Sequence, residues 1–417
     1  MPKTLPSHSS CLHATDFVPY LAGSLRVSAY QRMSLDELWG NRLARTLIPT
    51  PSGRHALWYF LELCRNRLNP GDEVIVAGYN FYVIIRVLIQ WGLVPVFADI
   101  EPGTLCLDAA QIDKTVTSRT RLVVVTHMFG HPAAMQAIRS VCQQHDLLLF
   151  EDCAHAVGTL GADGLQMGQY GEGALFSFGI HKIINTFGGG MLAVMDELVD
   201  ESALPDFRTS RRESFLYTFS RFIASAMMHP STVGWVIQPT LYLSRLLAQK
   251  GWPGLSRALE PARDNPSYRF VLNERAPFKD FMRRMMAMQL DRLEDNIQRR
   301  RAVRQQIREG LAHVEEIGWL DEDAHGRSNA AYFGIRVPSP AALSEFLIER
   351  GVMTNPREFY DCSRLTQFAQ YAAVCPHSAH ASDHILRLPS YPYLTPSQSH
   401  RIVAGIEAYF ARPVTRA

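Results

Sequence analysis

Short apolar runs rich in β-branched residues alternate with helix-like stretches from Gly53 to about Met195. Four of the runs are almost continuously apolar, as strands buried on both faces should be. Strands that alternate with helices in this way are typical of an α/β fold, in which helices cover a mostly parallel sheet. The runs expected as strands are 73–76, 94–98, 121–126, 147–150, 174–178 and 191–194.

The pattern changes after about residue 278. Residues 278–311 are strongly helical, with Leu290, Leu293 and Ile297 on one face, and indicate a bridge to a smaller α/β region. In that region we expect a strand at 332–337 and helices at 340–350 and 396–409. The predicted organisation is an N-terminal segment over 1–45, a large α/β domain over 46–277, and the bridging helix with a small C-terminal domain over 278–417.

An apolar insertion is expected within the large domain, at about 202–276. Its segment 222–244 contains no Asp, Glu, Lys or Arg, and its length would span a bilayer. Pro230, Gly234 and Pro239 interrupt it, and a spanning helix tolerates such breaks poorly. Three interpretations stay open: a buried hairpin or subunit interface, an interfacial helix in peripheral contact with a membrane, and a true span.

Composition narrows the class of protein. The 417 residues are 47% apolar and 20% charged, which excludes a disordered or collagen-like chain. The net charge of +2 supplies no broad field for a polyanion, so we expect no nucleic-acid partner and interpret the basic run Arg299–Arg301 as a solvated helix face. The seven cysteines are scattered without a C-x-x-C pair, and residues 1–20 lack a signal-peptide pattern. Both features favour a cytoplasmic protein.

The densest candidate chemistry follows the strands expected at 147–150 and 174–178. Asp152 comes directly after the first strand and Lys182 shortly after the second, so the two side chains are expected beyond neighbouring strand ends. An ion pair is one interpretation. The other is a Schiff-base lysine whose neighbouring carboxylate stabilises the protonated nitrogen of a pyridine cofactor.

A phosphate-bearing cofactor also needs hydrogen-bond donors and a flat apolar contact. Ser52 and Gly53 open a helical run whose first amides can hold a phosphate, and Ser177 lies five residues before Lys182. An aromatic group at 79–82 follows another strand and is suited to stack on a ring. These features together favour the cofactor site over the ion pair.

Several blocks, in order along the chain, resemble the DegT/DnrJ/StrS family of sugar-nucleotide aminotransferases. Residues 151–156 are similar to its E-D-x-A-[QH]-A element, 176–182 to F-S-F-x-x-x-K, and 127–132 to V-H-x-x-G-x-P. Further blocks at 71–76, 95–108, 289–301 and 388–394 bring the resemblance to most of 47–406. The resemblance implies the fold-type-I architecture and the cofactor pyridoxal 5′-phosphate.

The resemblance also implies roles for individual residues. Lys182 matches the family's Schiff-base lysine, where a dehydratase branch has histidine, and so favours transamination. The implied cofactor-binding residues are Asp152 at the pyridinium nitrogen, His155 beside the ring, Ser177, Ser52, Gly53 and Arg54 at the phosphate, and Phe81 as the stacking aromatic, with Tyr79 the second choice.

Three departures from the family pattern affect the expected site. Arg54 replaces a threonine of the phosphate loop, and 187–190 reads Phe-Gly-Gly-Gly where the family has G-E-G-G. The segment through which a partner subunit usually reaches the phosphate is not recognisable, and 273–277 takes its place. Substrate contacts are therefore less defined by the sequence than cofactor contacts.

The other histidines each have a structural and a functional interpretation. His377, His380 and His384 with Cys375 lie in a loop-like segment and are interpreted as surface residues, so no metal site is expected. His127 and His131 are left open between a role in the crevice and structural hydrogen bonding. His181 is left open between tuning Lys182, contacting substrate and packing.

The implied reaction moves an amino group from a donor, expected to be glutamate, to a keto sugar carried on a nucleotide. The product would serve a surface polysaccharide or a glycosylated metabolite, and the protein is expected to be a homodimer. One alternative is an enzyme of the same fold that acts on another substrate or as a dehydratase. A second is a membrane-associated binding or regulatory protein that retains the cofactor pocket and docks through 222–244.

Overall fold

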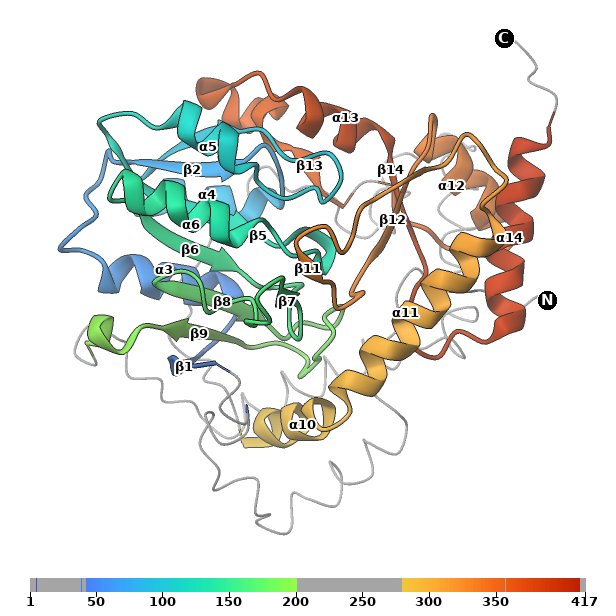
Figure 1. Ribbon diagram of the computed structural model, residues 1–417, viewed down its shortest axis with the longest axis horizontal. Helices are drawn as coiled ribbons and strands as arrows, with labels where there is room; N and C mark the ends of the chain where they lie inside the picture. Colours follow the sequence, from blue (N-terminus) through green and yellow to red (C-terminus); the bar gives the residue numbers. More distant parts are fainter. Residues whose placement is uncertain (1–4, 6–38, 40–42, 201–279, 357, 413–417) are drawn as a thin grey trace, which may run out of the picture.

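The computed structural model describes Leu5, Trp39 and residues 43–200, 280–356 and 358–412 (Figure 1). The apolar insertion predicted at 202–276, with its segment 222–244, lies outside the described residues, as does the segment 273–277. The interpretations left open for these segments therefore remain predictions.

A seven-stranded sheet, in the order β1-β9-β8-β6-β5-β2-β4, forms the centre of the larger part of the molecule. Within this sheet only β9 runs opposite to its neighbours, and the pairs β2–β4, β2–β5, β5–β6 and β6–β8 are parallel. The predicted mostly parallel sheet is thus confirmed, while β1 was not predicted. The strands are β1 (Thr46–Thr50), β2 (Glu73–Ala77), β4 (Val94–Ala98), β5 (Thr120–Thr126), β6 (Leu148–Asp152), β8 (Gly173–Ser177) and β9 (Gly190–Val194).

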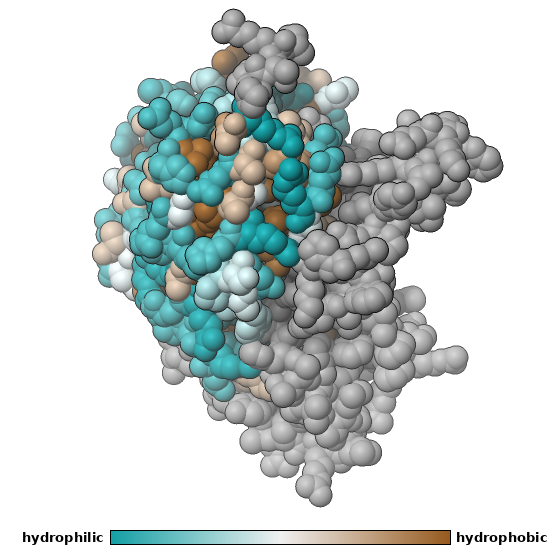
Figure 2. Space-filling view, turned by 90° about the vertical axis from the view of Figure 1, so that its right-hand side faces the viewer, coloured by the Kyte–Doolittle hydropathy of each residue, from teal (hydrophilic) through white to brown (hydrophobic). Residues whose placement is uncertain are grey.

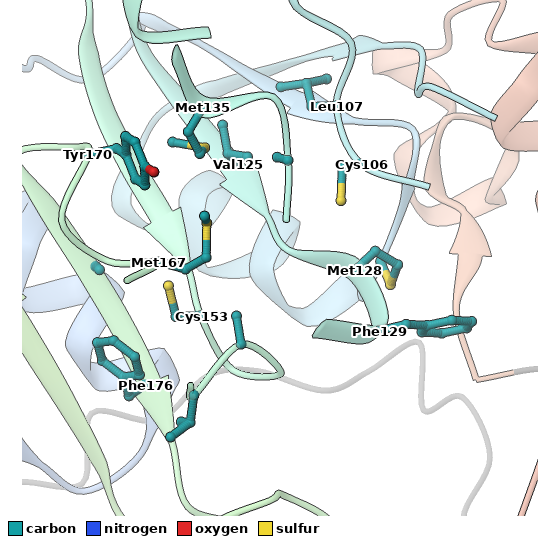
Figure 3. Close-up of a cluster of buried hydrophobic side chains, with 14 of the residues drawn as sticks. Cys106, Leu107, Val125, Met128, Phe129, Met135, Cys153, Met167, Tyr170 and Phe176 are labelled. Carbon is teal, nitrogen blue, oxygen red and sulfur yellow. The ribbon is translucent and has the colours of Figure 1, made fainter. Parts of the chain in front are cut away.

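Helices cover both faces of this sheet because its strands are apolar on both sides. Phe150 packs on the face covered by α3 and α4, and Leu149 packs on the face covered by α5 and α6. Figure 3 shows part of the second core, where Met167, Cys153 and Phe176 gather beside β6 and β8. The helices are α3 (Gly53–Leu63), α4 (Tyr82–Trp91), α5 (Ala109–Thr115) and α6 (Met135–Gln144).

The expected bridge consists of two helices, α10 (Asp280–Leu290) and α11 (Leu293–Gly310), rather than one continuous helix. It leads to a three-stranded antiparallel sheet of β10 (Gly318–Trp319), β12 (Phe333–Arg336) and β14 (Ile385–Leu388). The helices α12 (Pro340–Glu349) and α14 (Pro396–Phe410) pack on this sheet around a separate apolar core. A capping box formed by Thr395 and Gln398 starts α14.

Short elements connect these two parts. Two-stranded pairings join β3 to β13 and β7 to β11, so each pairs a segment of the first part with one that follows the bridge. Residues 376–384 form α13 rather than the predicted loop, because Pro376 starts a helix at its first position. The elements are β3 (Tyr79–Asn80), β7 (Leu160–Gly161), β11 (Gly326–Arg327), β13 (Tyr360–Asp361), α13 (Pro376–His384), η2 (Met128–Gly130), η3 (Asp196–Leu198), η5 (Cys362–Arg364) and η6 (Thr366–Tyr371).

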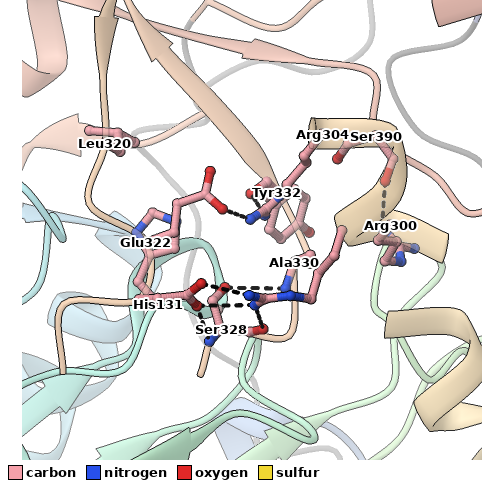
Figure 4. A network of polar contacts seen from close by, with 12 residues as sticks. His131, Arg300, Arg304, Leu320, Glu322, Ser328, Ala330, Tyr332 and Ser390 are labelled. Carbon is pink, nitrogen blue, oxygen red and sulfur yellow. Dashed lines mark hydrogen bonds and ion pairs between the residues drawn. The ribbon is translucent and has the colours of Figure 1, made fainter. Parts of the chain in front are cut away.

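The basic run predicted as a solvated helix face is exposed at Arg299 but not at Arg300. Arg300 is only 6% exposed and donates to the carbonyl oxygens of Ala331 and Ser390, both at 3.1 Å. One turn further on, Arg304 pairs with Glu322 and donates to the carbonyl of Tyr332 (Figure 4). Because an arginine carries several donors in a planar fork, one helix can hold several carbonyls of the segments beside it.

On the face that Figure 2 shows, the described residues are mostly hydrophilic, with hydrophobic residues visible between the polar ones. Over the described ranges, no helix combines the length and the apolar character needed to cross a membrane.

Glu151 anchors a loop to the end of β6. Its buried carboxylate accepts hydrogen bonds from the backbone amides of Gly168 at 2.8 Å, Tyr170 at 2.8 Å and Gly171 at 2.9 Å. The ring of His127 lies 3.1 Å from the same carboxylate. These contacts satisfy both oxygens, so Glu151 holds the 168–171 loop in place.

We expect Glu151→Ala to reduce the free energy of unfolding by about 3 kcal/mol or more, because buried amides that lose their acceptor each cost about 1–3 kcal/mol. Denaturant unfolding followed by circular dichroism measures this change. The exposed Glu197 offers a matched control, and Glu197→Ala should change stability by no more than about 0.5 kcal/mol. Equal effects of the two substitutions would contradict the anchoring role.

Candidate active site

The site is built at the ends of two adjacent parallel strands. Asp152 is the last residue of β6 and pairs in register with Leu175 of β8, the strand that leads to Lys182. The Asp152 carboxylate is 4% exposed and accepts a hydrogen bond from the backbone amide of Ala154 at 3.0 Å. The hydroxyl of Thr126, at the end of β5, lies 3.5 Å from its other oxygen. The structure therefore brings the predicted acid and lysine to neighbouring strand ends.

Burial has opposite effects on the two charged groups. It raises the pKa of Asp152, and the nearby Lys182 opposes this shift. It lowers the pKa of Lys182 from 10.5 to about 8, and the carboxylates of Asp152 and Glu358 oppose that shift. At pH 7 roughly a tenth of the molecules then have a neutral Lys182 amine, far more than for an ordinary lysine, and a nucleophilic lysine requires the neutral form.

The loop that carries Lys182 is held at several points. The Lys182 amide donates to the carbonyl of Gly179 at 3.0 Å, which closes a turn. Further along the loop, the side-chain amide of Gln289, on α10, accepts from the backbone amide of Asn185 at 2.9 Å and donates to its carbonyl at 2.8 Å. This two-way bond gives Gln289 a structural role in positioning the lysine loop.

The two candidate stacking residues differ in exposure. The ring of Phe81, just before α4, is 39% exposed. Tyr79 is buried in β3, which pairs with β13. An exposed aromatic ring at a strand end is available to stack on a flat ligand, so the structure favours Phe81 over Tyr79 for this role.

His155 is buried between aromatic rings. Its ring centroid lies 4.6 Å from that of Tyr332 and 5.4 Å from that of Phe359, both in edge-on arrangements. Its Nδ1 atom is buried and has no hydrogen-bond partner among the described residues. Burial lowers the pKa of His155 well below its usual value, so the ring is neutral. A neutral ring with an unsatisfied nitrogen suits contact with a polar group of a ligand.

The expected phosphate residues gather at the start of α3. Ser52 is the N-cap residue, but its side chain does not cap the helix and instead lies 2.9 Å from the Nδ1 atom of His55. A β-carbon on Gly53 would lie 3.2 Å from that of Ser177, and Ser52 bridges to Gly189. The partly buried Arg54 follows in the first turn. This turn, Ser177 and the glycine segment therefore form one compact cradle.

Sequence analysis missed several residues around this site. The side-chain oxygen of Asn80 accepts from the amide of Phe81 at 2.7 Å and from the hydroxyl of Thr126 at 3.3 Å. Because the Thr126 hydroxyl also lies near Asp152, these three polar side chains form one row. Phe359 and Arg387 come from the part of the chain that follows the bridge. One signal for Arg387 is visible in the sequence, since a charge within the apolar strand Ile385–Leu388 requires a buried partner.

The departure at 187–190 has a backbone consequence. Phe187 is buried and has a φ of 64°, a left-handed conformation that bulky residues rarely adopt and that glycine adopts freely. The resemblance has glycine at this position. The buried aromatic side chain beside the lysine loop is therefore accompanied by local backbone strain at Phe187.

The remaining histidines separate into structural and surface groups. His127 bonds to Glu151, and its Nδ1 atom accepts from the amide of Ala133 at 3.3 Å, which favours the structural interpretation. His131 lies 2.9 Å from the carbonyl oxygen of Thr104 through its own Nδ1. His181 is exposed. His377 and His380 are exposed on α13, where His380 stacks on His384.

One set of buried residues has the chemistry of metal ligands. His127, Glu151 and Cys153 place ligand atoms within 4.8 Å of one another. The Glu151 carboxylate, however, is already satisfied by three amides and His127, and burial raises the pKa of the Cys153 thiol well above its usual value. A neutral thiol and an occupied carboxylate do not favour a cation, so hydrogen bonding explains this set.

The residues present fit pyridoxal phosphate. A buried carboxylate and a lysine with a lowered pKa lie beyond the ends of β6 and β8, and the exposed ring of Phe81 lies near Phe359, which contacts His155. The unsatisfied Nδ1 of His155 and the uncapped start of α3 supply polar contacts for the ring and the phosphate. Asp152, His155, Phe81, Ser52, Gly53 and Ser177 would hold the cofactor, with Arg54 adding a positive charge.

Comparisons with known proteins agree on the family. The profile of the DegT/DnrJ/EryC1/StrS aminotransferase family matches residues 36–213 and 277–407. The chain is 36% identical over 149 residues to an L-glutamine:2-deoxy-scyllo-inosose aminotransferase of Streptomyces paromomycinus, covering 36% of this chain and 34% of that protein. It is 41% identical over 138 residues to the spore coat polysaccharide biosynthesis protein SpsC of Bacillus subtilis (strain 168), covering 33% and 35%. The matches thus span about a third of the length of these curated relatives.

Solved structures share the fold over nearly the whole chain. DesI, crystallised in the presence of its TDP-sugar product, superimposes with a TM-score of 0.71 at 23% identity and covers 99% of this chain and 94% of its own. An aminotransferase from Psychrobacter cryohalolentis superimposes with a TM-score of 0.73 at 19% identity and covers 98% and 99%. With the family profile matching most of the chain and this shared fold-type-I architecture, the chain belongs to the DegT/DnrJ/EryC1/StrS aminotransferase family, whose members depend on pyridoxal phosphate.

Proposed function

We propose that this protein is a pyridoxal-phosphate-dependent aminotransferase that transfers an amino group from glutamate to a keto sugar carried on a nucleotide. The observation that carries the proposal is the placement of Lys182 beside the buried Asp152 at the ends of adjacent strands. The names of the relatives support amino transfer, and the GDP-perosamine synthase of Vibrio cholerae supports a sugar carried on a nucleotide, while the inosose aminotransferases name L-glutamine as the donor. A product for a surface polysaccharide or a glycosylated metabolite is in keeping with these names.

The cofactor, when bound, would act as an electron sink for the bond between the donor's Cα and its hydrogen. Asp152 would stabilise positive charge at the ring nitrogen, because a buried carboxylate gains most from a cationic neighbour. Lys182 would hold the cofactor and then accept and return the proton through its Nζ atom. Phe81 would orient the ring, and the start of α3 with Ser177 would bind the phosphate.

We also propose that the active enzyme is a homodimer, as the resemblance implies. Fold-type-I sites are completed by a second subunit, and the described residues leave Phe81 exposed beside the proposed site. The departures at Arg54 and 187–190 lie among the proposed phosphate and lysine-loop residues, so they would adjust binding rather than the reaction.

Lys182→Ala should abolish the visible absorption band of the lysine-bound cofactor and lower the transamination rate roughly a thousandfold or more, because the variant lacks both the covalent attachment and the proton carrier. Absorption spectra before and after addition of glutamate measure both effects. In the wild type, glutamate should convert the band to that of the pyridoxamine form.

The exposed Lys114 provides the control, and Lys114→Ala should behave as the wild type. A wild-type protein that binds the cofactor but is unchanged by glutamate and other amino acids would contradict the aminotransferase proposal.

The pH dependence of Lys182 gives a second test. Because its pKa is lowered to about 8, the amine in the cofactor-free protein should become reactive as the pH rises through about 8, instead of near 10.5. Between these two values the unfolded chain binds a proton that the folded protein does not, so this group makes stability increase with pH in that window. Labelling with an amine-reactive reagent at a series of pH values, read out by mass spectrometry, measures the midpoint.

Asp152→Asn should move that midpoint lower still, since it removes the carboxylate that favours the charged lysine. A midpoint near 10.5 in the wild type, or no response to Asp152→Asn, would argue against the proposed pairing.

A further inference from the structure

A buried asparagine connects the part of the molecule that follows the bridge to the loop that carries His155. Asn329 is fully buried, and its side-chain nitrogen donates to the carbonyl oxygens of His155 at 2.6 Å and Val157 at 2.9 Å. Its side-chain oxygen accepts from the backbone amide of Ala331 at 2.9 Å. Both donors of the side chain are thus used on the His155 loop, while its acceptor is used on its own segment.

The segment around Asn329 is also held by the bridge. Arg301 of α11 donates to the carbonyl oxygen of Ser328 at 3.0 Å, and Arg300 donates to that of Ala331 at 3.1 Å. Ser328 is fully buried, like Asn329. The Asn329 amide therefore projects from a segment whose backbone is itself hydrogen-bonded on both sides of residue 329, so a change in the His155 loop is resisted by α11.

The contact is close enough to require glycine at position 130. Gly130 has a φ of 84°, and a β-carbon there would collide with Oδ1 of Asn329 and lie 2.9 Å from the carbonyl oxygen of His155. A side chain at this position would therefore displace the Asn329 amide or the His155 backbone. Substitution of Gly130 gives a second way to disturb the contact without changing Asn329 itself.

The direction of the His155 ring depends on this segment and on its backbone. The ring of Tyr332, three residues after Asn329, packs edge-on against the His155 ring, and Phe359 packs on it in the same way. The Nδ1 atom of His155 makes no hydrogen bond among the described residues. Backbone hydrogen bonds and ring packing, rather than a partner of Nδ1, therefore set where this nitrogen points.

We propose that Asn329 is a positioning residue, which holds the carbonyls of His155 and Val157 and so orients Nδ1 of His155 for contact with the cofactor. The inference rests on the proposed function, in which His155 contacts the cofactor ring, and extends it to a residue from the other part of the molecule. Asparagine suits this position because its amide supplies two donors and an acceptor at once, whereas a serine hydroxyl supplies a single donor.

A residue that only supports the fold would behave differently from a positioning residue. Its removal would disturb the whole site, and the effect would add to that of removing the nitrogens of His155. A residue that acts through His155 loses its effect once those nitrogens are absent. Because non-additivity reports such coupling, a double-mutant cycle separates the two roles.

The experiment titrates the visible band of the holoenzyme with pH, without an amino donor, for the wild type, Asn329→Ala, His155→Phe and the double variant. A hydrogen bond that favours one protonation state of the bound cofactor shifts the midpoint of this titration. We expect each single substitution to shift the midpoint by about half a pH unit or more in the same direction, and the double variant to match His155→Phe. Gly130→Ala should shift it in that direction too. The exposed Asn66 supplies the control, and Asn66→Ala should keep the wild-type midpoint.

Hydrogen exchange of the cofactor-free protein gives a readout that needs no cofactor. We expect the backbone amides of 155–159 to exchange about tenfold faster or more in Asn329→Ala than in the wild type, because the loop has lost two of its hydrogen bonds. Asn329→Asp keeps the size of the side chain but, when ionised, has no donor for the two carbonyls, so it should have a similar effect. Asn66→Ala should leave this exchange unchanged.

Additive shifts from Asn329→Ala and His155→Phe would overturn the proposal, as would a folded Asn329→Ala variant with the wild-type midpoint or the wild-type exchange over 155–159. If Asn329→Ala does not fold, Gly130→Ala decides in its place, and a wild-type midpoint for that variant overturns the proposal.

Failure of the proposed function has a different signature. A holoenzyme that shows the expected midpoints but is unchanged by glutamate and other amino acids retains the positioning role of Asn329 and loses the aminotransferase activity. A wild type that forms no visible band with added cofactor overturns both.

Discussion

The two-residue period of a strand, applied to the end of β6, is the constraint on which the site depends. Glu151 and Asp152 are adjacent carboxylates, and successive side chains of a strand point to opposite faces of the sheet. Glu151 follows Leu149 on the face covered by α5 and α6, where it binds the 168–171 loop. Asp152 follows Phe150 on the face of α3 and α4. One carboxylate is therefore structural, and the other is free to face the start of α3 and the lysine loop.

The electrostatics of the site follow from this burial. A carboxylate and an amine placed in the same water-poor region each become easier to neutralise, and each stabilises the charge of the other. The charges of Asp152, Glu358 and Arg387 all act on the pKa of Lys182, so its amine responds to charges from both parts of the molecule. Such a lysine can be neutral when it reacts and charged when it carries a proton.

The bridge between the two parts is hydrogen-bonded to the segments beside the site. Gln289 of α10 clamps the lysine loop, while Arg300 and Arg304 of α11 hold the carbonyls of Ala331, Tyr332 and Ser390. Tyr332 in turn packs on His155. The arginines of α11 thus bind backbone carbonyls of the segments beside the site, and every residue type provides such a carbonyl.

The sequence by itself determined the order of the strands along the chain, the type of fold, and the placement of Asp152 and Lys182 at neighbouring strand ends, because hydrophobic periodicity and short-range spacing are local properties. Only the tertiary structure decided that Arg300 is buried, that Phe81 rather than Tyr79 is exposed, and that Tyr332, Phe359 and Arg387 surround His155 and the lysine loop. The contacts of His155 with Tyr332 and Phe359 join residues 177 and 204 positions apart, and they depend on how the two parts of the molecule pack together, which no local pattern encodes.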